Sequence, residues 1–439
     1  MFENEEKKLH EMKGKIDKVE VPSNIDEYIL KGIHEAKGQG RSVHSIWKWG
    51  SVAACLLLLI MFTSIKVSPT FASYVSTIPG MQKIVDLMRN DKGMISIIEN
   101  DYLQVIDETV EENGVKLTID AIIVDEDRAF LYYTIETDQP YGNVMLSDTR
   151  FTDKEGKELP LSSGVYSHGN VEKNIPISGE LFLAYPVENQ LPSEIVLRTG
   201  VDADGKEVLV SQGIPITIDY EKFSAIKKVY EVNKTVTIEG QKMLVEKVEI
   251  RPTRIAVSVL YDETNTHKIF GYDNIRLVDE RGEVWTEQIP TTSFIETNPN
   301  RDILYFESNY FAEPKALYLE FSSVRALPKD EVELVVDIDT DKIIQQPSDN
   351  RFISVATSFK DIVFEHQSDD SIAHGAILFS SYVDANGTEY HSSFSRSGDR
   401  LNNIREVGFE LFSEAKSPLT FTITDYPNRL KQDVRLKLK

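Results

Sequence analysis

The fold of this chain is decided by IWKWGSVAACLLLLIMFTSI, residues 46–65. Its one charged residue, Lys48, lies near its start, and a helix of this length measures about 30 Å, the thickness of a bilayer's hydrocarbon core. A buried helix of a soluble domain is the alternative, which so long an apolar run disfavours. We therefore expect one transmembrane helix over residues 46–66. Interfacial tryptophans and apolar residues would anchor it: Trp47, Trp49, Leu56, Leu57, Leu58, Leu59, Ile60 and Phe62.

Charge is divided unevenly by this segment. Residues 1–48 hold nine basic and nine acidic residues, so the whole formal charge of −23 lies after them. Basic residues are denser at the start of the span than after it: Lys31, Lys37 and Arg41 precede it, Lys48 lies in its first turn, and Lys66 and Lys83 follow. Since basic residues stay on the cytoplasmic side, we expect a cytoplasmic N-terminus and extracellular C-terminal domains. An outer part this acidic repels nucleic acid, so we expect no direct nucleic acid binding.

A cleaved signal peptide is the competing interpretation of the span. Phe71-Ala72-Ser73 could serve as its cleavage site, but the 45 residues before the span are far longer than a signal's basic region. The only cysteine, Cys55, lies inside the span, so the outer part has no disulfide. An exported chain without disulfides suits a Gram-positive cell surface.

Two short amphipathic helices are predicted before the span. Apolar residues recur at helical spacing on each side of Val21-Pro22, which separates the two helices. Two such helices cannot bury both stripes against each other, so we expect residues 1–45 to complete their core on a partner. The alternative is a loosely ordered tail on the membrane. The residues expected to bind the partner are Leu9, Met12, Ile16, Ile25, Tyr28, Ile29 and Ile33.

Residues 67–98 predict short juxtamembrane helices, punctuated by Pro69 and Pro79-Gly80. The second helix has an apolar face that should pack on the first outer domain or on the bilayer. The members of that face are Met81, Ile84, Val85 and Met88.

From about residue 100 the apolar pattern alternates with period two, which indicates strands. Three landmarks recur at a spacing of about 110 residues. The first is an alternating segment that begins at Gly114, Gln241 and Lys360. The second is an Asp-x-x-Gly turn at Asp153, Asp279 and Asp384. The third is a proline followed by a strand at Pro192, Pro314 and Pro418.

These repeats predict a mainly β chain with three extracellular immunoglobulin-like β-sandwich domains. We place the domains at residues 99–222, 223–347 and 348–439. The glycine turns suggest calcium, but the Asp-x-Asp-x-Asp-Gly loop is absent, and a left-handed glycine in a hairpin explains each turn without metal.

No catalytic constellation is present in the sequence. It has no Gly-x-Ser-x-Gly, His-Glu-x-x-His or phosphate-binding loop. His366, His374 and His391 lack the spacing of a metal set and are interpreted as surface histidines. We therefore expect no enzyme, no cofactor and no metal site.

The segment SPTFASYVSTIPGMQKIVDLMRNDKG, residues 68–93, carries a family resemblance. The chain resembles Bacillus-type membrane proteins with a β domain of unassigned function, many of which are described as anti-sigma factors for extracytoplasmic-function sigma factors. The resemblance covers roughly residues 1–220, and immunoglobulin-like modules often follow. The motif residues here are Pro69, Phe71, Ala72, Ile78, Pro79, Gly80, Asp91, Lys92 and Gly93.

Two functional hypotheses follow. In the first, residues 1–45 sequester a sigma factor, the outer domains sense envelope conditions, and cleavage, with an intramembrane protease as a further partner, releases the sigma factor. In the second, the chain is a surface-exposed binding or adhesive stalk with no transcriptional role. An envelope hydrolase would need an activity that the motifs do not indicate.

Overall fold

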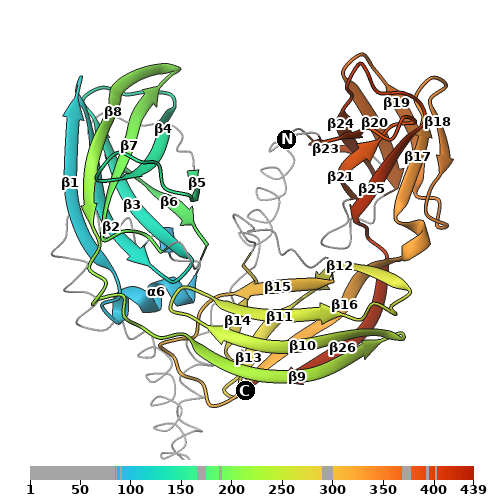
Figure 1. The fold of residues 1–439 in the computed structure, drawn as a ribbon, viewed down its shortest axis with the longest axis horizontal. Helices are drawn as coiled ribbons and strands as arrows, with labels where there is room; N and C mark the ends of the chain where they lie inside the picture. The colour runs from blue at the N-terminus through green and yellow to red at the C-terminus, as the bar shows by residue number, and fades with distance from the viewer. Residues whose placement is uncertain are drawn as a thin grey trace, which may run out of the picture. The chain divides into compact units, whose positions relative to one another are not determined.

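The computed structural model describes residues 85, 87–88, 91–165, 175–186, 190–288, 300–367, 377–391, 395–400 and 403–439. Within them the chain is mainly β, as predicted, with six sheets and one complete α-helix (Figure 1). No helix among the described residues is both long and apolar enough to cross a bilayer. The predicted span 46–66, with its anchoring residues, and the predicted partner-binding segment 1–45 lie outside the described residues.

The first sandwich pairs a five-stranded sheet with a three-stranded sheet around one core. The sheet order is β1-β2-β3-β6-β5 in one layer and β4-β7-β8 in the other. The strands are β1 (Gln104–Glu112), β2 (Val115–Val124), β3 (Arg128–Thr137), β4 (Val144–Asp153), β5 (Ser162–Val165), β6 (Ile177–Ala184), β7 (Glu194–Ala203) and β8 (Lys206–Thr217).

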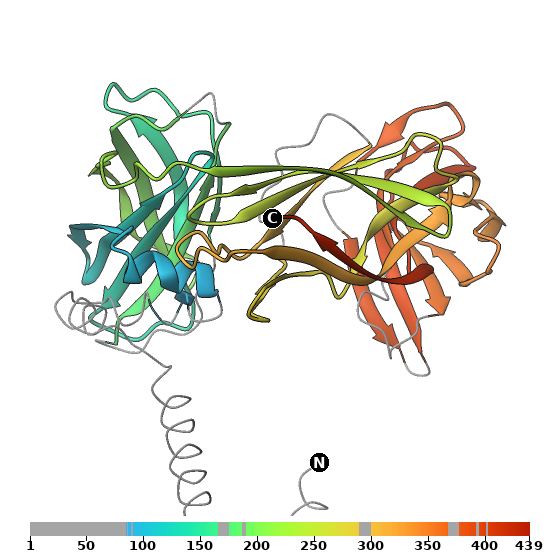
Figure 2. The ribbon, with the colours of Figure 1, turned by 90° about the horizontal axis from the view of Figure 1, so that it is seen from below.

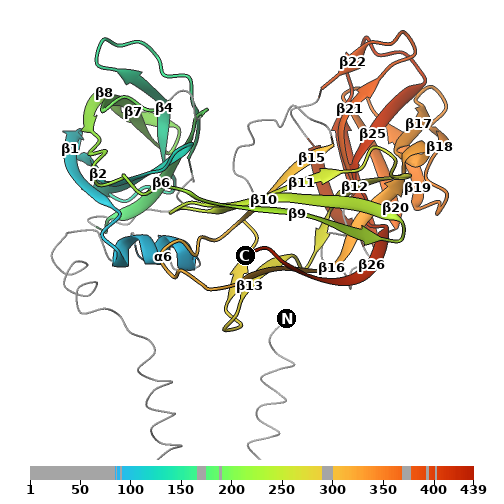
Figure 3. The same ribbon diagram turned by 60° about the horizontal axis from the view of Figure 1, so that its bottom comes forward.

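Helix α6 (Lys92–Glu99) belongs to the first sandwich. Met94, Ile97 and Ile98 on its apolar face are buried in that core, together with Met88. The helix lies across one end of the sandwich (Figure 3). The expected packing of the juxtamembrane apolar face on the first outer domain is therefore confirmed for Val85 and Met88, the described members of that face. Because α6 shares the first core, that domain begins before the predicted residue 99.

The second sandwich has the sheet orders β15-β11-β10-β9 and β12-β16-β13-β14. Its strands from the middle of the chain are β9 (Lys228–Ile238), β10 (Gln241–Ile250), β11 (Ile255–Tyr261), β12 (His267–Asp273), β13 (Arg276–Asp279), β14 (Val284–Thr286), β15 (Arg301–Phe306) and β16 (Leu317–Pro328). The last strand of the chain, β26 (Arg429–Lys437), pairs with β16 and completes the second sheet. This dark red strand lies beside the orange strand β16 of the second sandwich (Figure 2).

The third sandwich is inserted between β16 and β26. Its sheets have the orders β18-β17-β25-β21-β22 and β19-β20-β24-β23. A short 3-10 helix, η2 (Lys329–Glu331), precedes them. The strands are β17 (Glu333–Asp337), β18 (Lys342–Gln345), β19 (Phe352–Thr357), β20 (Asp361–Gln367), β21 (Leu378–Val383), β22 (Glu389–Tyr390), β23 (Ser395–Arg400), β24 (Ile404–Glu410) and β25 (Leu419–Asp425).

This topology corrects the boundary placed between residues 347 and 348. Leu334 and Val336 of β17 lie in the third core, so that domain starts earlier than expected. Leu430 and Leu438 lie in the second core, so residues 429–438 belong to the second domain rather than to the third. The alternating apolar pattern of these residues predicts a strand of the third domain, which is nearest in sequence. Only the pairing with β16 shows that the strand belongs to the second domain.

His366 also differs from its interpretation as a surface histidine. The side chain is 1% exposed, and its Nδ1 lies 3.3 Å from the Gln367 carbonyl oxygen. Its ring lies edge-on to Phe352, so it fills the third core as an aromatic side chain. Burial lowers the pKa of His366, which keeps the ring neutral.

Candidate functional site: the joint between the first two sandwiches

The motif residues Asp91, Lys92 and Gly93 form the start of α6 and contact the second sandwich. Asp91 is the N-cap, and its Oδ1 accepts the Met94 backbone N–H at 3.0 Å, as expected at a helix start. Its other carboxylate oxygen accepts from the side-chain amide of Gln288, which follows β14. A single carboxylate therefore caps the helix and holds the second sandwich.

Lys92 contacts the same region of the second sandwich. Its Nζ donates to the Val284 carbonyl oxygen at 3.1 Å and forms an ion pair with Glu283. The ammonium also lies 5.9 Å from the centre of the Trp285 ring. Since both members of the ion pair are about half exposed, its contribution to stability is small. The contact orients the helix more than it stabilises it.

Gly93 permits the closest approach between the two sandwiches. A Cβ at this position would lie 2.6 Å from the Ser308 nitrogen and 2.9 Å from the Ser308 oxygen, both backbone atoms of the segment after β15. Real Cβ atoms do not approach backbone this closely. The motif glycine is therefore explained by backbone contact between the sandwiches and not by a left-handed turn.

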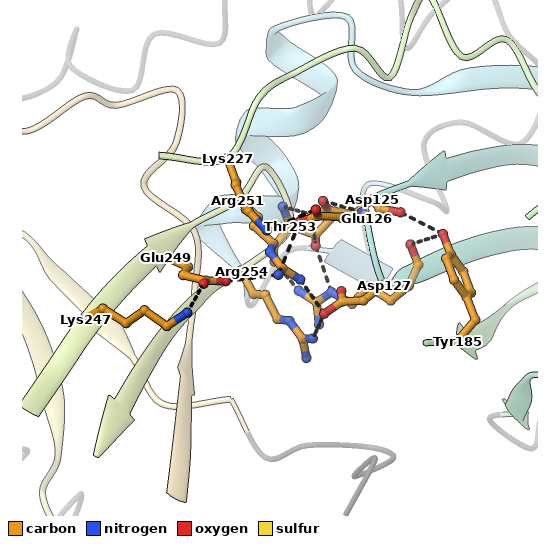
Figure 4. Close-up of polar contacts among 11 residues, drawn as sticks. Asp125, Glu126, Asp127, Tyr185, Lys227, Lys247, Glu249, Arg251, Thr253 and Arg254 are labelled. Atoms are coloured by element: carbon orange, nitrogen blue, oxygen red, sulfur yellow. Dashed lines mark hydrogen bonds and ion pairs between the residues drawn. The ribbon is translucent and has the colours of Figure 1, made fainter. Parts of the chain in front are cut away.

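A second set of contacts joins two hairpin turns, residues 125–127 between β2 and β3 and residues 251–254 between β10 and β11 (Figure 4). Thr253 is fully buried there. Its N–H and its hydroxyl donate to Asp125 Oδ2 at 3.1 and 2.5 Å. Arg128 Nε in turn donates to the Thr253 hydroxyl oxygen at 2.7 Å. From the first sandwich, the Tyr185 hydroxyl donates to the Asp125 carbonyl oxygen at 2.7 Å, which fixes the first turn.

Ion pairs surround these hydrogen bonds. Asp127 pairs with both Arg251 and Arg254, and all three side chains are mostly buried. Arg251 also bonds Glu249 at 3.0 Å and lies 3.3 Å from Glu126. Breaking a buried pair by removing one partner costs about 3–5 kcal/mol, since the remaining charge stays buried. We call residues 91–93, 125–128, 249–254, 283–288 and 307–309 together the joint.

The pKa values of two aspartates of the joint, Asp91 and Asp127, are shifted in opposite directions. Burial raises the pKa of Asp91, and the nearby Glu307 raises it further. Burial would raise the pKa of Asp127 too, but Arg254, Arg251 and Arg128 outweigh it and the pKa is lowered. Asp127 is thus an ion-paired carboxylate at neutral pH, whereas Asp91 is held by hydrogen bonds against a cost of burial.

The joint provides contacts between two domains, and most of its charged side chains pair with one another. Asn309 Nδ2 and Oδ1 and Trp285 Nε1 are buried there without a hydrogen-bond partner in the part of the chain that the structure describes. Among the described residues, no group of three or more His, Cys, Asp or Glu side chains is placed to hold a metal ion.

The sequence predicted part of this site. Of its motif residues, Asp91, Lys92 and Gly93 meet at the joint, whereas Pro69, Phe71, Ala72, Ile78, Pro79 and Gly80 lie outside the described residues. The two turns, residues 125–127 and 251–254, were not predicted as part of a site. The available signal was charge: Asp125-Glu126-Asp127 and Arg251-Pro-Thr-Arg254 occupy the same hairpin position in the first and second repeats. Opposite charges at equivalent positions of adjacent repeats are compatible with a contact, but solvated surface charges give the same pattern.

Comparisons with known proteins match two segments of the chain. Residues 44–137 match the family described as Domain of unknown function (DUF4179), and residues 227–352 match the family of unknown function DUF5643. The first match contains Asp91, Lys92 and Gly93, and the second contains the segments 283–288 and 307–309 that they contact. Among curated proteins, none matches the sequence.

Solved structures with similarity to part of the chain include an uncharacterised bacterial protein. It is described as the crystal structure of the conserved domain protein from Bacillus anthracis, with 16% identity and a TM-score of 0.33 over 55% of this chain and 84% of that chain. A score this low does not define a shared fold.

Proposed function

We propose that this protein is a single-pass membrane regulator that sequesters an extracytoplasmic-function sigma factor through residues 1–45. In this proposal the helix 46–66 spans the cell membrane, with the N-terminus in the cytoplasm. Three immunoglobulin-like domains lie outside and sense envelope conditions. The partners are the sigma factor, the lipid bilayer and an intramembrane protease, and the chain makes no direct contact with nucleic acid.

The joint is the observation that carries this proposal. The three motif residues at the start of α6 contact the second sandwich, while the rest of α6 lies in the core of the first. The chain that leads back toward residue 66 is thus attached to both sandwiches at one point. A change in either sandwich acts on the segment nearest the proposed span. The DUF4179 match supports the same proposal, because that family is commonly associated with anti-sigma factor-like membrane proteins.

The test is co-purification of the full-length chain with RNA polymerase sigma subunits. We expect one sigma factor to be retained, and Ile29→Asp to release it and raise transcription of its target operon. A carboxylate in the apolar stripe would be buried without a partner on binding. Lys31→Asp, which places the same group off the stripe, is the matched control and should retain the sigma factor.

Reproducible absence of any retained sigma subunit would reject the proposal. The stalk hypothesis makes the opposite prediction for a deletion of residues 2–40, which would then leave the phenotype intact.

A further inference from the structure

A pocket of about 260 Å³ opens beside the joint. Its inner wall is Tyr102, Val124 and Phe223, which are buried in the first core. Its other lining residues from the linker between the two sandwiches are Tyr220, Ala225, Ile226 and Lys227. The volume lies just below the roughly 300–1,000 Å³ of pockets for drug-sized molecules. The space therefore suits a small ligand.

The lining combines aromatic rings with carboxylates. Tyr102 and Phe223 pack edge to face with centroids 5.3 Å apart, and Tyr220 adds a third ring. Among the lining residues, Asp125 and Glu126 add two carboxylates and Lys227 adds one ammonium, while Arg251 of the joint also lies 3.3 Å from Glu126. Aromatic rings and two carboxylates in the lining both favour a cation. An anion would meet two carboxylates and is disfavoured.

One of these carboxylates, that of Glu126, can exchange its Lys227 partner for a ligand. Glu126 pairs with Lys227 at 3.0 Å, and both side chains are about one-third exposed. A pair this exposed is worth about 0–1 kcal/mol, so a ligand ammonium can replace Lys227 at little cost. Asp125 is more firmly held, since it accepts two hydrogen bonds from the buried Thr253.

We propose that this pocket binds a small organic cation with an aromatic or apolar body, and that this ligand is one stimulus of the regulator. The second half of the inference rests on the proposed function, whereas binding itself does not. Asp125 also accepts a hydrogen bond from Thr253, and Glu126 also pairs with Arg251, both of the second sandwich. The carboxylates that contact a bound ligand are therefore the same ones that hold the joint. The ligand thus acts on the contacts that hold α6 to both sandwiches.

The test uses the full-length chain in lipid nanodiscs and two probes of equal size, benzylamine and benzyl alcohol. Binding is measured by saturation-transfer NMR at pH 7, where only benzylamine is a cation. We expect benzylamine to bind about five- to tenfold more tightly than benzyl alcohol, because of its charge. Equal binding of the two probes, or no binding of either, overturns the proposal.

Three variants locate the site. Lys227→Ala should tighten benzylamine binding, because Glu126 loses its competing ammonium. Tyr220→Leu should weaken it several-fold, and Tyr318→Leu, on β16 outside the pocket, should leave it unchanged. Unchanged binding in Lys227→Ala and Tyr220→Leu overturns the site, and Lys227→Ala keeps this test decisive if Tyr220→Leu fails to fold. Retention of the sigma factor is measured separately, so failure here and failure of the proposed function are distinguishable.

Discussion

At the scale of single residues, Gly93 is the most constrained position of the joint. Replacing it with alanine puts a Cβ where the Ser308 backbone already lies. Overpacking of this kind costs about 1–3 kcal/mol, and the segments that touch must separate to relieve it. We expect Gly93→Ala to speed hydrogen exchange of the amides in α6 and at residues 307–309 by about fivefold or more.

Gly164→Ala is the matched control for this prediction. Gly164 lies on β5 with no atom within 4 Å of its added Cβ, so exchange at the joint should not change. Parental exchange rates in Gly93→Ala would show that the backbones do not approach closely there.

The stability of the first sandwich should depend on pH through the buried carboxyl group of Asp120. Asp120 is 6% exposed on β2, accepts from the Thr134 hydroxyl at 2.8 Å, and burial raises its pKa to about 6. Its folded pKa exceeds its unfolded pKa, so the associated stability is complete below about pH 4 and is lost as the pH rises through 6. Asp120→Asn keeps the acceptor without the charge. Urea unfolding should show this variant to be more stable by about 1–3 kcal/mol at pH 7.5, with the gain vanishing near pH 4.

The exposed Asp148→Asn serves as the control for that measurement and should show no such pH dependence. If the gain of Asp120→Asn were the same at pH 4 and pH 7.5, ionisation of Asp120 would not be its cause.

The joint could be predicted only in part from its amino acids. The resemblance singled out Asp91, Lys92 and Gly93, but their common role is to contact Gln288, Val284 and Ser308, about 200 residues further along the chain. Contacts at such separation leave no local pattern. The charges of residues 125–127 and 251–254 were visible, but solvated surface charges look the same in a chain this acidic.

At the scale of elements, the three repeated landmarks could be predicted because each depends on residues that are close together in the sequence. The three Asp-x-x-Gly turns share one geometry: the glycine has φ between 79° and 88°, and its N–H donates to the aspartate carbonyl oxygen. In each, the aspartate Oδ1 also accepts a backbone N–H four residues on, at 2.9 Å. This confirms the predicted hairpin role of these glycines.

The proline landmarks are equally regular. Each precedes a strand, β7, β16 or β25, that pairs with the strand leading into the Asp-x-x-Gly turn of its own repeat, β4, β13 or β21. The third repeat departs from the others at its first landmark. There β20 pairs with β19 and β24, whereas β21 lies in the opposite sheet. Alternation shows which residues of a strand are buried, but it does not choose the sheet.

At the scale of the whole described region, the chain passes twice between the second and third sandwiches. It leaves the second sandwich after β16 and returns to it as β26. Charged side chains hold this crossing together: Arg325 bonds both Asp273 and Asp425, and Arg429 bonds Asp273. The third sandwich is therefore tied at both of its ends, and the chain's last strand stabilises a domain that begins 200 residues earlier.

This topology predicts an unusual effect of truncation. A chain ending at Tyr426 keeps every described residue of the third core but removes Leu430 and Leu438 from the second. Loss of two buried leucines costs several kcal/mol, and β16 also loses its hydrogen-bonded neighbour. We expect hydrogen exchange to speed at residues 318–325 of β16, while the strands of the third sandwich keep their protection. Gln432→Ala, exposed in the same strand, should change neither. Loss of protection confined to the third sandwich would instead assign β26 to that domain, as its position in the sequence suggests.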